Sequence, residues 1–234
     1  MWKWVLVPGI IYAILFVIGI GFFIQTASDV IEFLTYRLNL NEFVQKLKSS
    51  WIGFLFTMGG ITVWMILLLF YFSVFKYLWL IACSPLYALL SQRTEAIIAK
   101  ESFRIDYSKL KVTLNRAVIL ALSNFLRQTL YLLIIFFVSL IPIIGWIMPL
   151  VAIFFECFFY GYSMLDYSLE RLNIISEDSF AITNKNKGLA FGNGMLFYLM
   201  HFLPIIGWVL APAYAIVAAT ICIHQYNPYP SKEK

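Results

Sequence analysis

Few residues of this sequence could perform chemistry, and the most unusual of them is an acid inside an apolar run. Two phenylalanines directly precede Glu156, and two more follow it within three residues. A carboxyl group at membrane depth costs free energy unless it is protonated or paired. Glu156 is therefore either a proton- or ion-coupling group, or an acid that bonds to a neighbouring helix or lies near the membrane interface.

Two further ionisable residues, His201 and Lys76, lie in or near apolar runs. His201 stands three residues before Pro204, so its imidazole either takes part in coupling or hydrogen-bonds a backbone carbonyl that the proline leaves unpaired. Lys76 lies toward the end of its apolar run, and we expect its ammonium group to extend to the lipid headgroups.

Motifs of catalysis are absent. The sequence has no G-x-x-x-x-G-K-[ST] phosphate loop, no H-E-x-x-H zinc pair and no G-x-S-x-G nucleophile turn. Its three cysteines, Cys83, Cys157 and Cys222, are far apart and lack metal-binding or redox spacing. We expect no enzyme activity, no cofactor and no metal site.

The composition places these residues in a membrane protein. Hydrophobic residues make up 62% of the chain and charged residues 12%, whereas soluble domains are roughly 45–50% apolar and about 25% charged. We expect one all-α, membrane-embedded domain over residues 1–234, with the lipid bilayer as its main partner. The basic residues flank apolar runs, so nucleic acid is not an expected partner.

Apolar runs of about 20 residues predict two spanning helices, at about 4–24 and 61–83, with the second ending near Pro85. Residues 29–50 have the spacing of an amphipathic helix. Residues 91–128 carry seven of the seventeen basic residues, which predicts a cytoplasmic segment.

An internal repeat dominates the rest of the chain. The sequence Pro-Ile-Ile-Gly-Trp occurs at 142–146 and again at 204–208, and a second proline follows each copy. Proline and glycine break helices, so each copy predicts a bend between two helical arms. The expected bend residues are Pro142, Gly145, Pro149, Pro204, Gly207 and Pro212.

The arms of the second repeat measure about 15 Å and 24 Å at 1.5 Å per residue, less than the roughly 30 Å of hydrocarbon. Two hairpins that enter and leave on one face, at about 129–165 and 194–223, therefore fit better than four full crossings. Residues 166–193 between them would share the cytoplasmic side with 91–128. Broken helices at membrane depth also occur in solute paths, although the bends could serve packing alone.

At these residues the sequence resembles the membrane proteins typified by the bacterial sulfate permease CysZ and the eukaryotic etoposide-induced protein. The matching features are the first bend with Pro149, Asp166-Tyr167, Phe191-Gly192, the prolines Pro204 and Pro212, and Ala218-Ala219-Thr220. The resemblance implies two long spanning helices, two half-penetrating hairpins and a homo-oligomer. In the bacterial branch it also implies sulfate permeation.

The resemblance further implies an anion site near the head of the first helix and after Ser84-Pro85. The residues suited to it here are Lys3, Ser91, Gln92 and Arg93, a set of cations and polar groups near helix ends. Two departures from the family pattern are that only Lys3 occupies the basic stretch and that Ala88 stands where the family has glycine.

Two functions follow from these observations. The first is a permease or channel-like transporter for a small inorganic anion, with sulfate as the expected substrate, in a bacterial inner membrane. The second is a membrane organiser that inserts its hairpins into the bilayer without transporting a solute. A permease needs polar groups between its helices, whereas an organiser needs only apolar arms and a polar face.

Overall fold

The computed structural model describes residues 2–37, 51–100, 102, 107–141, 143–172 and 174–226. Within them the elements are helical and no strand occurs, so the all-α prediction is confirmed. The helices are α1 (Trp2–Arg37), α3 (Trp51–Ala99), α4 (Tyr107–Ser139), α5 (Met148–Arg171), α6 (Ser176–Lys185), α7 (Lys187–His201) and α8 (Ile206–Tyr226), with a short 3-10 helix, η1 (Ile144–Ile147).

The first two long helices extend past their predicted ends. Helix α1 has 36 residues and continues from the expected span into the start of the expected amphipathic segment. The remainder of that segment, residues 38–50, lies outside the described residues. Helix α3 has 49 residues and contains Pro85, so the prediction that it ends near this proline is wrong.

Helix α3 is bonded to α5 close to the position where it passes through Pro85. Proline removes a backbone donor and disturbs the carbonyls of the preceding turn, and neighbouring helices can supply replacement donors. Here the hydroxyl of Tyr167 donates to the carbonyl oxygen of Leu80 at 3.1 Å. This bond lies one residue before Ile81, whose carbonyl lacks its helical donor because Pro85 has no amide hydrogen.

The arms of the first hairpin are also longer than predicted. Helix α4 has 33 residues and α5 has 24, so the expected boundary at residue 129 lies inside α4. Residues 114–139 are long and apolar enough for a membrane span, and they overlap the segment 91–128 that the sequence predicts to be cytoplasmic. In the described part of the chain, five helices meet the length and hydropathy of a span: α1, α3, α4, α5 with η1, and α8.

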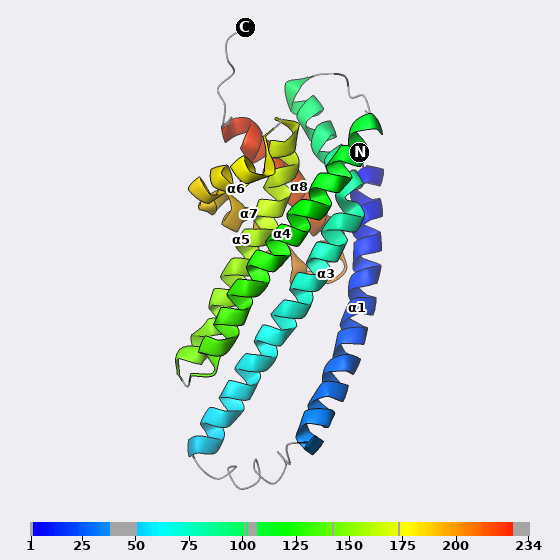
Figure 1. The fold of residues 1–234 in the computed structure, drawn as a ribbon. Helices are drawn as coiled ribbons and strands as arrows, with labels where there is room; N and C mark the ends of the chain where they lie inside the picture. The colour runs from blue at the N-terminus through cyan, green and yellow to red at the C-terminus, as the bar shows by residue number, and fades with distance from the viewer. Residues whose placement is uncertain are drawn as a thin grey trace.

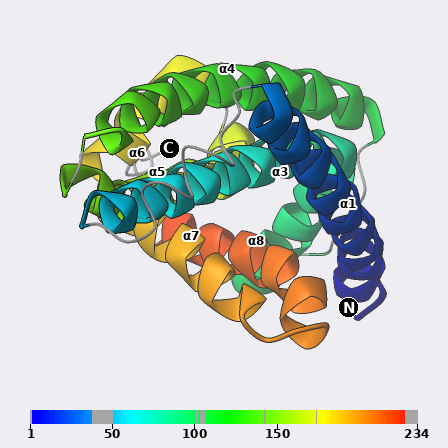
Figure 2. The same cartoon turned by 90° about the horizontal axis from the view of Figure 1, so that it is seen from below.

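The helices pack around α3 and α5. Seen along the bundle in Figure 2, α4 lies on one side of α3, and α7 and α8 lie on the opposite side. Helix α1 packs against α3 and α8. In Figure 1 the loop joining α4 and α5 lies near one end of the bundle, whereas the loop joining α7 and α8 lies at about mid-height.

Glycines allow the two hairpins to touch backbone to backbone. A Cβ atom added to Gly161 of α5 would collide with the carbonyl of Ala190 in α7, and one added to Gly194 of α7 would collide with the carbonyl of Cys157 in α5. Small residues at such crossings let membrane helices approach closely. The α5–α7 contact therefore depends on these two positions.

The repeat forms the same bend twice. Ile143 and Ile205, the equivalent residues of the two copies, have φ angles of 74° and 64°, which is strained for a β-branched residue. Around Ile205 the amide of Ile206 donates to the carbonyl of Pro204 at 2.7 Å, which closes a three-residue γ-turn. The two copies thus share a positive φ at the residue after their first proline; Pro142 itself lies outside the described residues.

The other predicted bend residues have different places. Gly145 lies in η1, and Gly207 lies in the first turn of α8; each is buried, with no room for a Cβ atom. Pro149 occupies the first turn of α5, where a missing amide donor costs little. Pro212 lies inside α8. These two prolines therefore follow the bends and do not form them.

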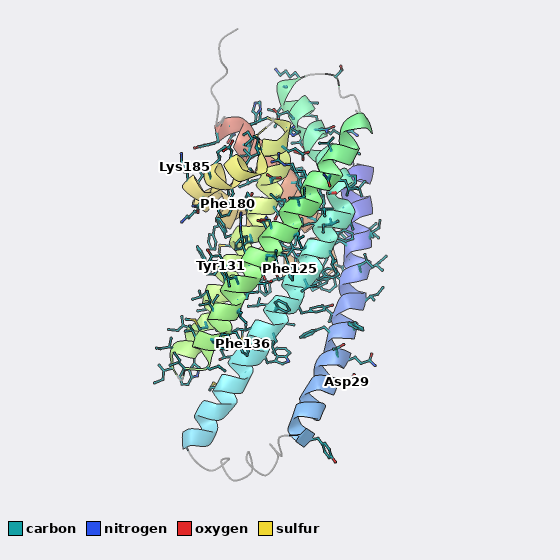
Figure 3. The ribbon with its side chains drawn as sticks, in the orientation of Figure 1. Asp29, Phe125, Tyr131, Phe136, Phe180 and Lys185 are labelled. Carbon is teal, nitrogen blue, oxygen red and sulfur yellow. The ribbon has the colours of Figure 1, made fainter. Side chains whose placement is uncertain are left out.

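The polar connections gather at one end of the bundle. In Figure 3, Lys185 and Phe180 of α6 lie toward the end that also holds the C-terminal part of α3, while Asp29 of α1 lies toward the other end. The C-terminal part of α3 and helix α6 thus lie toward the same end of the bundle. Which end faces the cytoplasm stays a prediction.

Candidate functional site

A buried ion pair lies between the two hairpins and α3. Lys76 Nζ is 2.7 Å from Glu156 Oε2, and the side chains of the two residues are only 5% and 1% exposed. Lys76 therefore does not extend to the headgroups, which corrects the sequence prediction. Removing two charges from water is compensated only where further hydrogen bonds complete their shells.

Three more side chains complete those shells. Gln128 of α4 accepts hydrogen bonds from Lys76 Nζ at 2.8 Å and from the Tyr77 hydroxyl at 2.7 Å, and its amide nitrogen donates to Glu156. Tyr198 of α7 donates to Glu156 at 2.9 Å. The network joins α3, α4, α5 and α7, so it lies where a permease would need polar groups.

A second ion pair lies nearer the end that carries α6. The guanidinium of Arg116 in α4 donates to both carboxylate oxygens of Asp166 in α5, at 2.7 Å and 3.1 Å. Arg116 also donates to the backbone carbonyl of Ile174, and Ser179 of α6 donates to Asp166. Such two-point pairs are geometrically specific, and this one fixes α6 against the first hairpin.

Three hydroxyl groups meet where α3, α5 and α8 converge. Ser91 Oγ lies 2.9 Å from Thr220 Oγ1 and 3.3 Å from Ser168 Oγ, and the last two are 3.1 Å apart. One turn farther along the same three helices, Glu95 pairs with Arg171 at 3.2 Å and with His224 at 3.0 Å.

The predicted anion-site residues separate in the structure. Ser91 is fully buried beside the hydroxyl groups of Ser168 and Thr220, a cluster that we name the hydroxyl layer. Gln92 and Arg93, the next two residues of α3, are half-buried. Consecutive helical residues point about 100° apart, so the three cannot converge on one ligand from α3 alone. Lys3 belongs to the first turn of α1, whose N-terminal end lies at the same end of the bundle as this part of α3 (Figure 1); its side chain lies outside the described residues.

His201 lies at the bend of the second hairpin. Its Nε2 is 2.8 Å from the hydroxyl of Tyr12 in α1, and its Nδ1 is 3.3 Å from the carbonyl of Phe197. The carbonyl of His201 itself accepts a hydrogen bond from the indole of Trp208 at 3.0 Å. The imidazole thus joins α7 to α1, and Trp208 pairs one of the carbonyls left free at the helix end.

Several functional candidates escaped prediction from sequence. Lys76, Gln128 and Tyr198 join Glu156 only in the folded chain. One signal was available: Arg116, Asn124 and Gln128 recur at multiples of four residues, which places them on one helical face. Among the described residues, no group of three or more His, Cys, Asp or Glu could hold a metal ion.

The fold and the buried charges define the class: a multi-pass helical membrane protein with ionisable groups inside its helical bundle. The model of the family described as "Sulfate transporter CysZ/Etoposide-induced protein 2.4" matches residues 1–212 of the 234. The chain belongs to this family, which confirms the resemblance seen in the sequence. No individual curated protein shows a significant match to the chain.

Proposed function

We propose that the protein is a permease or channel-like transporter for a small inorganic anion, with sulfate as the substrate to test first. The family match supports a sulfate-transporter-like protein. It also supports a transporting role rather than an enzymatic one. The inorganic anion, a second copy of the chain and the bilayer are the proposed partners, and a bacterial inner membrane is the proposed location.

One observation carries the choice of a permease over a membrane organiser. The Lys76–Glu156 pair and its three polar partners lie between four helices, one of which belongs to the second hairpin. Ionisable residues inside spanning segments are costly and mark ion or solute pathways more often than structural contacts. An organiser that only wedges the bilayer needs no such network.

The proposed arrangement in the membrane differs for the two hairpins. The 15 residues of α7 extend about 22 Å, which is less than the roughly 30 Å of hydrocarbon. We place the α7–α8 bend inside the bilayer, with the polar end of the bundle in the cytoplasm. The arms of the first hairpin are long enough to cross.

The proposed anion entrance lies at the polar end, near the head of α1 and residues 91–93. Two cations, Lys3 and Arg93, belong to these two segments. The hydroxyl layer at Ser91 lies next to them in α3, deeper in the bundle. Charge-assisted hydrogen bonds from such groups suit a dianion.

The test is uptake of radiolabelled sulfate into proteoliposomes, with thiosulfate, phosphate and chloride as competitors. We expect saturable uptake by the natural protein and its loss in Lys3→Ala and Arg93→Ala. Lys187→Ala, at an exposed position that begins α7, is the matched charge control and should transport normally. Uptake no higher than in empty liposomes for every anion would contradict the proposal and favour the membrane organiser.

A further inference from the structure

The interface of α4 and α5 is a ladder of polar pairs. The two helices are antiparallel, and three residues on one face of α4 meet three on α5: Arg116 with Asp166, Asn124 with Ser163, and Gln128 with Glu156. The first and last pairs are 12 residues apart along α4, or about 18 Å. This ladder, which we name the α4–α5 seam, connects the end that carries α6 with the buried Lys76–Glu156 pair.

The seam has room and unused hydrogen-bonding capacity. A cavity of about 10 Å³ lies between the first and second pairs, close to the space that one water molecule requires. Its lining consists of Leu80, Ala117, Leu120, Ala121, Ser163, Asp166, Tyr167 and Glu170.

Asn124, about one turn farther along α4 than the cavity, has a buried polar atom without a partner in the described part of the chain. It is fully buried, and its side-chain oxygen has no hydrogen-bond partner among the described residues. Buried polar atoms of native proteins are nearly always paired with protein or water. Water in the seam would complete the shell of this oxygen.

The seam is polar in one direction only. Beyond the Gln128–Glu156 pair, the next inward positions are Leu132 and Ile135 of α4 and Ala152 of α5, which pack with Ile66 of α3 in an apolar cluster. Water has no hydrogen-bonding partner in such a cluster. A route along the seam would therefore end at Glu156.

We infer that the α4–α5 seam is a one-sided water route that carries water and protons from the α6 end of the bundle to the Lys76–Glu156 pair. Glu156 is the end point because Lys76, Gln128 and Tyr198 bond its carboxylate from three other helices. The inference gives the proposed transporter a proton-accessible group, but its test does not require transport.

Silver ions are suited to the test because they are close to water in size and react with thiolates. The natural cysteines are first replaced by alanine. Single cysteines are then introduced at Ala117, Ala121 or Asn124 in the seam, and at Leu132 in the apolar cluster beyond it. Proteoliposomes are then exposed to silver, and the remaining thiols are labelled with a fluorescent maleimide after denaturation. Leu122→Cys is the control at the same depth, since Leu122 is 57% exposed on the outer face of α4.

Silver should block the seam cysteines at least roughly tenfold faster than cysteines at Leu122 or Leu132, because only the seam admits water. Equal rates at residues 121 and 122 would show that the seam is dry. Equal rates at 121 and 132 would show that the route is not one-sided. Ala117→Cys and Ala121→Cys are small changes that keep the test valid if Asn124→Cys fails to fold. Loss of sulfate uptake would leave these rates unaffected, so the two proposals fail separately.

Discussion

The two hairpins contain the same five-residue repeat, but different forces hold them in place. The α4–α5 hairpin is joined internally and to α3 by ion pairs and amides, whereas the α7–α8 hairpin is held mainly by aromatic rings and close glycine contacts. Their bends share a left-handed isoleucine, with Ile143 67% and Ile205 70% exposed. The repeat therefore specifies a local bend, and the surroundings of each copy decide its depth and partners.

The surroundings differ most at the residues next to each bend. In the second hairpin, His201 and Trp208 pack against Tyr12 and Phe16 of α1. In the first hairpin the backbone at Ser139 closes directly over Gly145, as the backbone at Met200 closes over Gly207 in the second. Both bends thus fold back on their own arms. They differ in the separate helix that they contact, which is α3 for η1 of the first hairpin and α1 for the second.

The largest effect on stability is expected from breaking the Lys76–Glu156 pair, which joins α3 to the first hairpin. Lys76→Ala leaves Glu156 buried without its cation, which should lower the free energy of unfolding by about 3–5 kcal/mol. Unfolding by SDS in mixed micelles, followed by circular dichroism, measures the change. Arg171→Ala breaks a partly exposed pair and should cost at most about 1 kcal/mol.

A double variant separates charge from packing at this site. Lys76→Met with Glu156→Met removes both charges, so it should be more stable than Lys76→Ala alone. If the double variant is no more stable than the single one, the pair does not act as a unit and the contrast between the hairpins is weakened.

The contact between the hairpins should be the next most sensitive feature. Gly194→Ala places a Cβ atom against the backbone of Cys157, and such overpacking costs roughly 1–3 kcal/mol. Gly192→Ala in the same helix meets nothing within 4 Å and provides the control. Comparable unfolding curves for the two variants would contradict the close α5–α7 crossing.

A smaller effect is expected where the second hairpin meets α1. Tyr12→Phe removes the hydroxyl group that bonds His201, a loss of about 0.5–1.5 kcal/mol. Tyr131→Phe, at an exposed tyrosine of α4, should leave stability unchanged in the same assay. An unchanged midpoint for Tyr12→Phe would show that aromatic packing alone holds this bend.

The smallest effect should be equal in the two copies. Ile143→Gly and Ile205→Gly relieve about 1–2 kcal/mol of left-handed strain but lose about 0.5–1 kcal/mol through chain entropy. A net gain of roughly 0.5 kcal/mol is expected in each. Ile206→Gly, at an exposed helical position, should instead destabilise. Unequal responses of residues 143 and 205 would mean that the repeat does not specify one bend.

Local sequence signals predicted the fold better than its boundaries. The repeat located both bends because left-handed turns and close glycines are properties of a few consecutive residues. Pro85 predicted an end that α3 does not have, since the helix continues to Ala99 and packs against α5 and α8. The predicted boundary between a polar segment ending at residue 128 and a hairpin beginning at 129 does not exist, because α4 runs through it. The polar residues of α4 lie on a face that is buried against α5.

The candidate site could likewise be predicted only where a local signal marks the residue. Glu156 was identified because an acid among phenylalanines is costly wherever it lies in a membrane. Its cation was not, because Lys76 looks like a residue that extends to the headgroups. Burial of both side chains against α4 and α7 decides otherwise.

The sequence by itself determined an all-helical membrane protein and its family, because hydrophobicity and short helix-breaking motifs act over short stretches of chain. Only the tertiary structure decided the partners of the buried charges and the paths of the long helices. Glu156 lies 80 residues from Lys76 and 42 from Tyr198. Contacts over such separations depend on which helix faces meet, and no local pattern specifies that.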